Sequence, residues 1–147
     1  MKYLSIACIF FSFLFVACSE QSEKQLTETK LLSIQNRDTL NIKIIENKSE
    51  KRFFGSYKLN KPGDEIVIGD IQGNIKGDSL IGDLYYTPFG WKDKKRKPFA
   101  LLKQKNGYLL GHGTEQVYMG IPYYIPGTIR FDSTSMVLKT VAGTISP

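Results

Sequence analysis

The chain has 147 residues, of which 20 are Lys or Arg and 14 are Asp or Glu, so its formal net charge at pH 7 is +6. This length fits one folded domain and excludes two domains of ordinary size. The excess of positive charge affects which partners the protein meets more than it affects the fold, and it favours anionic partners.

The first residues have the pattern of an export signal. Lys2 supplies a positive charge, and residues 3–17 form a run of 15 without a charged side chain, rich in Leu, Ile, Phe and Val. A run of this length suits the core of a signal peptide and is shorter than the roughly 20 residues of a membrane-spanning helix. Since the chain turns polar at Ser19 and Glu20, we expect residues 1–17 to be a signal peptide.

The junction that follows, LFVAC at residues 14–18, resembles the lipobox of bacterial lipoproteins, in which a Cys follows a small residue and a short apolar stretch. The resemblance implies cleavage before Cys18, attachment of a diacylglycerol to its sulfur and acylation of the new amino group, for example by palmitate. Two or three acyl chains hold a protein firmly on a membrane. Ser19 is typical of lipoproteins sorted to the outer membrane, so we expect a lipid-anchored envelope protein there, on the periplasmic or the surface face.

Removal of the signal would leave 130 residues without a free thiol. Lys2 is the one charged residue among the first 17, so 19 basic and 14 acidic residues remain, and the net charge is then about +5. Of the two cysteines, Cys8 is lost with the signal and Cys18 carries the lipid. We therefore expect neither a disulfide nor a thiolate metal site in the folded domain, whose stability must come from its core.

Residues 18–29 read as the lipidated Cys and a flexible tether, because they are polar and almost without large apolar groups. Residues 30–147 read as a β domain, since short runs rich in Ile, Val, Tyr, Phe and Leu recur between Gly, Asn, Asp and Pro. Apolar residues alternate in 40–44, 53–59 and 80–86, as in strands with one face in a core. We predict an all-β fold, an antiparallel meander of about eight to ten short strands, arranged as a small barrel or a sandwich.

Turn residues indicate how the strands connect. Asn106-Gly107 favours a type I′ hairpin turn, because both residues readily adopt positive φ. Gly77-Asp78 suits a type II′ turn, with Gly at the first central position. Residues 61–64, Lys-Pro-Gly-Asp, predict a wider turn.

The segment 87–99 contains a candidate ligand-binding or partner-binding site. It combines Trp91 with five basic residues and one acidic residue, Asp93; the bases are Lys92, Lys94, Lys95, Arg96 and Lys97. We expect a long loop between strands, and such loops often carry function. A Trp beside several cations could hold a phosphate or a sugar acid, or lie against a lipid surface. The alternative is a solvated basic loop whose Trp covers one end of the core.

Two further groups are candidates for ligand binding. Tyr118, Tyr123 and Tyr124 could line a mouth or groove, although aromatic rings on strands commonly belong to the core. His112, between two glycines, could act as a base or a ligand. No second His or Cys accompanies it, so a metal site is not expected, and the alternative is a histidine near a strand end beside a glycine bulge.

No motif of a known catalytic centre is present: there is no GxSxG, phosphate loop, dinucleotide fingerprint or HExxH. We therefore predict no catalytic residue and no cofactor. The predicted function is that of a membrane-anchored binding or interaction module, whose partner is an anionic glycan, a glycolipid or an envelope protein. Nucleic acid is not expected as the partner of an exported protein. Two alternatives stay open, a structural envelope lipoprotein with a packed core and a hydrolase that uses His112 or acidic residues.

Overall fold

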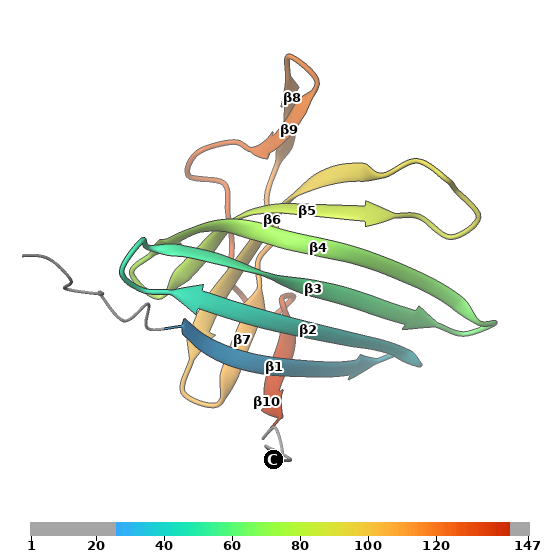
Figure 1. The fold of residues 1–147 in the computed structure, drawn as a ribbon, viewed down its shortest axis with the longest axis horizontal. Coiled ribbons are helices and arrows are strands. Elements are labelled where there is room, and N and C mark those ends of the chain that lie inside the picture. Colours follow the sequence, from blue (N-terminus) through green and yellow to red (C-terminus); the bar gives the residue numbers. More distant parts are fainter. Residues whose placement is uncertain (1–25, 142–147) are drawn as a thin grey trace, which may run out of the picture.

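The structure is a computed structural model and describes residues 26–141 (Figure 1). The predicted signal peptide, the lipobox and residues 18–25 of the tether lie outside the described residues. The described part consists of strands and turns without a helix. The strands are β1 (Leu26–Gln35), β2 (Asp38–Asn47), β3 (Arg52–Lys61), β4 (Glu65–Lys76), β5 (Ser79–Thr87), β6 (Lys95–Gln104), β7 (Gly107–Leu110), β8 (Glu115–Tyr118), β9 (Ile121–Tyr124) and β10 (Met136–Val141).

Eight of these strands close into an antiparallel barrel in the order β1-β10-β7-β6-β5-β4-β3-β2. The strands β1 to β7 follow one another as a meander; the chain then forms the separate hairpin β8–β9 and returns as β10, which fills the place between β7 and β1 (Figure 1). The predicted antiparallel meander is thus confirmed, and the barrel is the arrangement adopted. Closure gives both edge strands a partner, which an open sheet cannot do.

The first strand begins before the predicted start of the domain at residue 30. Residues 26–29 pair with residues 44–47 of β2, and Lys43 forms an ion pair of 2.9 Å with Glu28. These polar residues can join the sheet because strands pair through backbone hydrogen bonds, and every residue other than Pro has both a backbone donor and a backbone acceptor. The stretch expected as a tether is therefore shorter by four residues.

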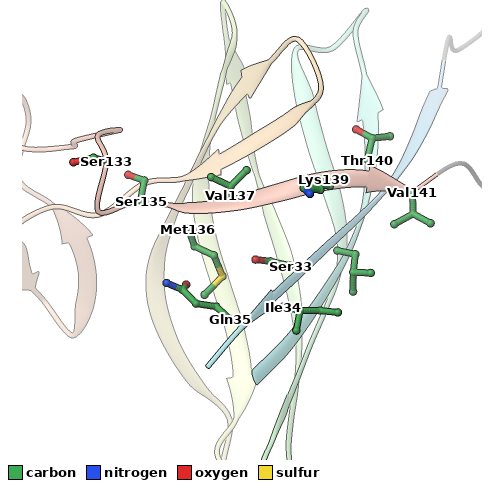
Figure 2. A pocket seen from close by; sticks show the side chains of 11 residues that line it. Ser33, Ile34, Gln35, Ser133, Ser135, Met136, Val137, Lys139, Thr140 and Val141 are labelled. Atoms are coloured by element: carbon green, nitrogen blue, oxygen red, sulfur yellow. The ribbon is translucent and has the colours of Figure 1, made fainter. Parts of the chain in front are cut away.

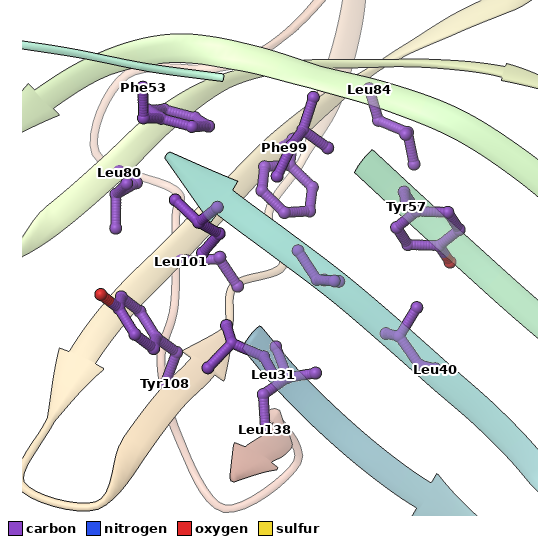
Figure 3. Close-up of a cluster of buried hydrophobic side chains, with 13 residues drawn as sticks. Leu31, Leu40, Phe53, Tyr57, Leu80, Leu84, Phe99, Leu101, Tyr108 and Leu138 are labelled. Carbon is purple, nitrogen blue, oxygen red and sulfur yellow. The ribbon is translucent and has the colours of Figure 1, made fainter. Parts of the chain in front are cut away.

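The interior of the barrel is filled by apolar side chains (Figure 3). The alternation in 40–44, 53–59 and 80–86 is confirmed, because the predicted inward positions supply much of the core. The buried cluster consists of Leu31, Leu40, Ile42, Ile44, Phe53, Tyr57, Ile71, Leu80, Leu84, Phe99, Leu101, Tyr108 and Leu138. These side chains come from all eight strands of the barrel, so the described residues share one hydrophobic core.

A buried hydrogen bond links β7 to β2 beside this core. The Tyr108 hydroxyl on β7 donates a hydrogen bond of 2.8 Å to Glu46 Oε1 on β2, and the two residues are 2% and 5% exposed. Burial, and then the hydrogen bond to the carboxylate, raise the pKa of Tyr108 well above its ordinary value. The contact joins strands that lie 62 residues apart in the sequence.

The strands β4 and β5 approach closely where Gly73 lies opposite Gly82. A Cβ atom added to Gly82 would lie 2.0 Å from the Gln72 carbonyl oxygen and 2.6 Å from the Gly73 Cα atom. Only glycine fits this approach, because real Cβ atoms do not come so near to backbone atoms.

The hairpin turns follow two of the three predictions. Lys76 pairs with Ser79 around Gly77-Asp78, where Gly77 has a φ of +58°, and the wider turn at 62–64 also forms. The prediction for Asn106-Gly107 is wrong by one residue, because Gly107 pairs with Gln104 and already belongs to β7. Gly107 is needed for close packing instead: a Cβ atom there would lie 2.0 Å from the Leu138 carbonyl oxygen of β10.

The two ends of the barrel differ. We call the end where β1 starts and β10 stops the proximal end; both lie there because Lys30 pairs with Val141. The opposite, distal end carries the turns 36–37 and 62–64, the loop 88–94 and the segment 111–135 with the hairpin β8–β9 (Figure 1). Successive antiparallel strands run in opposite directions, so a barrel of eight such strands starts and stops at the same end. Residues 26–141 contain no helix of the length and hydropathy that crossing a bilayer requires.

Candidate functional site

The loop 88–94 connects β5 to β6 at the distal end and carries Trp91. The Trp91 amide donates a hydrogen bond of 3.0 Å to the Pro88 carbonyl, and Gly90 has a φ of +75°, so a tight turn presents the indole, which is more than half exposed. The predicted loop of residues 87–99 is shorter than expected, because β6 begins at Lys95. Lys95 and Arg96 extend β6 because they pair with Tyr86 and Tyr85 of β5.

Strand alternation divides the bases of this segment between two faces. On the outer face, the Arg96 guanidinium makes two hydrogen bonds of 2.9 and 2.8 Å to the carboxylate of Asp83, which raise the pKa of Arg96. On the same face, Lys94 Nζ lies 3.3 Å from Asp70 Oδ2. The outer bases are thus held by acids from β4 and β5.

Two of the other three bases lie over aromatic rings at the mouth of the barrel. Lys95 Nζ is 3.9 Å from the centre of the Trp91 ring, and Lys97 Nζ is 5.6 Å from that of Tyr86, within the range of cation–π attraction. Partial desolvation lowers the pKa of Lys97, which as a whole residue stays exposed; the carboxylate of Glu115 opposes this shift. Ammonium groups placed in this way can bind an anionic group in place of their bound water.

We call Trp91, Tyr86, Lys92, Lys95 and Lys97 the basic-aromatic surface. Asp70 and Asp83 form ion pairs with Lys94 and Arg96, whereas the other three predicted bases form no ion pair within residues 26–141. Lys92 forms no ion pair with any residue of the described part. Aromatic faces beside ammonium groups can hold a sugar ring together with a phosphate or carboxylate. Binding by these residues remains a prediction.

His112 forms a small polar cluster with the turn that precedes β10. Its Nε2 lies 3.3 Å from Asp132 Oδ1 and 3.0 Å from Thr134 Oγ1, and the Thr134 hydroxyl is 2.6 Å from the same Oδ1. Hydrogen bonds from the Thr134 hydroxyl and amide, then that of His112, lower the pKa of Asp132 to about 2. A catalytic triad uses both nitrogens of its His, one toward the acid and one toward the nucleophile. Here the same nitrogen, Nε2 of His112, lies near both Asp132 and Thr134. The cluster therefore stabilises the turn before β10.

The three predicted tyrosines lie on the hairpin β8–β9, apart from Trp91's loop. Tyr123 donates a hydrogen bond of 2.8 Å to Gln116 Oε1, and Tyr124 lies near the Gly111 carbonyl at 3.5 Å. Burial raises the pKa of Tyr124, whereas Tyr118 is exposed. Tyr118 and Tyr123 share one face of the hairpin and Tyr124 lies on the other. The structure thus does not gather them into one mouth.

A groove of about 780 Å³ lies along the seam between β1 and β10, and the sequence did not indicate it (Figure 2). Residues 30–32 pair with 139–141, after which the strands diverge, while β10 stays paired with β7 and β1 with β2. Met136 and Gln35 lie at the wide end, and Ile34 and Val137 are exposed beside it. One feature of the sequence could have indicated the groove: Ile34 is apolar, although strand alternation places it on the outer face of β1.

Residues 26–141 contain no group of three or more His, Cys, Asp or Glu side chains arranged to hold a metal ion. Among known proteins, no family model matches the chain, and neither a curated protein nor a solved structure gives a significant match. The function must therefore be argued from the geometry of the chain itself.

Proposed function

We infer that this protein is an envelope lipoprotein, held on a membrane by lipid on Cys18, whose barrel is an interaction module for an anionic glycan or the phosphorylated head group of a glycolipid. The basic-aromatic surface is the contact site. The observation that carries this proposal is the placement of that surface at the distal end, opposite the end where the described chain starts and stops.

The filled interior favours contact through the outside of the barrel. Small barrels either enclose one ligand or are filled by their own side chains, and here Phe53 and Phe99 lie inside the barrel with ring centres 6.4 Å apart. A tether attached at the proximal end does not obstruct the distal loops, so these loops stay free to meet a partner.

The chemistry of the distal end favours an anionic sugar-containing partner. Lys92, Lys95 and Lys97 form no ion pair in the described part, although the charge of Glu115 acts on Lys97, and two of the three lie over aromatic rings. Ammonium groups bind phosphate as point charges, and aromatic faces pack against the apolar face of a sugar ring. A neutral partner would leave these cations without a counter-charge.

The test compares two pairs of substitutions with equal change of charge. Lys92→Ala/Lys95→Ala removes bases from the basic-aromatic surface, and Lys103→Ala/Lys105→Ala removes two exposed bases near the proximal turn of β6 and β7. The probe is a bisphosphorylated glycolipid, titrated into the soluble chain from Ser19 by calorimetry at 0.15 M salt. We expect the first pair to weaken binding roughly 10-fold, at about 0.7 kcal/mol for each lost contact.

The control pair decides between a site and general attraction to a basic protein. Lys103→Ala/Lys105→Ala should leave affinity within about twofold of the parent chain, because exposed charges more than a Debye length from a ligand are screened. An equal loss in both pairs, or no binding by the parent chain, would overturn the proposed site.

A further inference from the structure

The hairpin β8–β9 ends in an exposed apolar tip, which we define as Val117, Tyr118, Met119, Gly120 and Ile121. It projects from the barrel on the side away from the C-terminal end of β10 (Figure 1). Val117, Tyr118 and Met119 are 64%, 68% and 83% exposed, and Ile121 is exposed as well. Contiguous apolar groups at such exposure mark a contact surface.

The apolar side chains of the tip lie on both faces of the hairpin and at its turn. Val117 pairs with Pro122 on one face of the hairpin, Tyr118 pairs with Ile121 on the other, and Met119 extends from the turn. Docking on a partner protein would ordinarily cover one face and leave the other in water. An apolar medium such as the interior of a bilayer would surround the tip and remove the side chains of both faces from water.

The turn itself indicates that Met119 serves something other than the fold. Met119 and Gly120 have φ values of +49° and +78°, as in a type I′ turn. Asn, Asp or Gly suits the first central position of this turn, and a Met there is strained by its Cβ atom. Since Met119 is almost fully exposed, packing within the chain does not compensate for the strain.

The charge pattern fits the surface of a bilayer. Between Glu115 and Arg130 the chain has 14 residues without an acidic or basic side chain. Tyr123 and Tyr124 lie behind the tip, where amphipathic rings would meet the lipid head groups. The backbone of the tip is paired within the hairpin, as an apolar medium requires.

The base of the hairpin lies beside the basic-aromatic surface. The strand β9 packs beside β6, and the charge of Glu115 at the base of the hairpin acts on Lys97 of the basic-aromatic surface. Zwitterionic head groups below an inserted tip would therefore meet both the Glu115 carboxylate and the Lys97 ammonium group. The two strand residues and the turn extend about 7–10 Å beyond Gln116, at about 3.3 Å per residue, which matches the depth of interfacial insertion.

We propose that the β8–β9 tip is a lipid-insertion element that enters the interfacial region of a bilayer, independently of the acyl anchor on Cys18. The partner is the lipid surface itself, recognised by Val117, Tyr118, Met119 and Ile121. This goes beyond the proposed function, which concerns the basic-aromatic surface.

The experiment uses the unlipidated chain from Ser19 and vesicles of phosphatidylcholine alone, followed by co-sedimentation. Met119→Asn should lower the partition coefficient roughly 10-fold, since it removes an apolar side chain that would be buried in the bilayer. The same substitution should keep or raise the melting temperature, because Asn-Gly favours the type I′ turn. Ile34→Asn, which also removes an exposed apolar side chain, on β1, should leave partition unchanged.

A second readout locates the tip directly. Trp91 is the one Trp of the chain, so Trp91→Phe/Met119→Trp places the sole indole on the tip. With vesicles in excess, its emission should shift to the blue and be quenched by brominated lipid. Emission that stays that of a hydrated indole, or equal partition of Met119→Asn and the parent chain, would overturn the proposal and favour a protein partner. Because these vesicles carry no net charge, a failed glycolipid titration would leave this result unaffected.

Discussion

The hydrogen bond from Tyr108 to Glu46 allows a direct test of how the barrel is held together. The substitution Tyr108→Phe keeps the ring that packs in the core and removes only the hydroxyl. The Glu46 carboxylate, 5% exposed and 2.8 Å from that hydroxyl, then loses its donor from β7 while it stays buried. A carboxylate that loses a donor without regaining water is destabilised.

The size of the effect follows from this burial. A hydrogen bond to a charged group contributes about 1.5–3 kcal/mol, and both partners are buried here, so we expect a loss of about 2–3 kcal/mol of unfolding free energy. For a domain of this size that corresponds to a fall in melting temperature of roughly 8–12 °C. Glu46→Gln should cost less, because its amide oxygen still accepts from Tyr108.

The assay is urea unfolding of the chain from Ser19, followed by far-ultraviolet circular dichroism. A double-mutant cycle with Glu46→Leu isolates the pairwise contribution, which should be about 1 kcal/mol or more. A Tyr108→Phe chain within about 0.5 kcal/mol of the parent would show that Glu46 reaches water, and would refute the reasoning from burial.

Three further predictions concern single groups. Burial, and then the charges of its neighbours, raise the pKa of Tyr57 to about 12. The folded state thus favours the neutral phenol. The stabilisation that this gives is complete below about pH 10 and is lost as the pH rises toward 12. The parent chain should lose unfolding free energy between about pH 10 and pH 12, and Tyr57→Phe should make this loss about 2–3 kcal/mol smaller. If stability depends on pH in the same way in both chains, the prediction is wrong. Thr134→Ala should return the pKa of Asp132 from about 2 toward its ordinary value, as followed by NMR titration of the carboxyl carbon; a pKa that stays near 2 would assign the shift to other groups. Gly82→Ala should destabilise the barrel by about 1–3 kcal/mol in thermal unfolding, and an unchanged melting temperature would show that β4 and β5 can separate there.

The local pattern of the sequence predicted the class of fold because strand alternation is a local property. Tyr57 lies between the polar residues Ser56 and Lys58, and the even spacing between Phe53 and Tyr57 places both on one face of the strand. The turn at Gly77-Asp78 was predicted for the same reason. At Gly107 the prediction was off by one residue, because the glycine is required by the nearby backbone of β10, 31 residues later in the sequence at Leu138.

The candidate site was predicted in part. The sequence singled out Trp91 and the bases beside it, because aromatic and basic residues gathered in one segment are visible without a structure. It could not indicate that Asp70 and Asp83 would neutralise Lys94 and Arg96, since those contacts depend on which strands become neighbours. The exposed tip around Met119 was also not predicted, because alternating apolar residues do not reveal whether a hairpin joins the core or projects from it.

By itself, the sequence determined an all-β domain, the inward faces of its longer strands, and a basic segment with one Trp. The tertiary structure alone decided that β10 returns between β7 and β1, that Tyr108 meets Glu46 beside the core, and that a groove opens along the seam. The physical reason is that alternation and turn preferences act over a few residues, whereas closure of the barrel pairs segments such as Lys30 and Val141, whose contact arises only when the whole set of strands buries a common core.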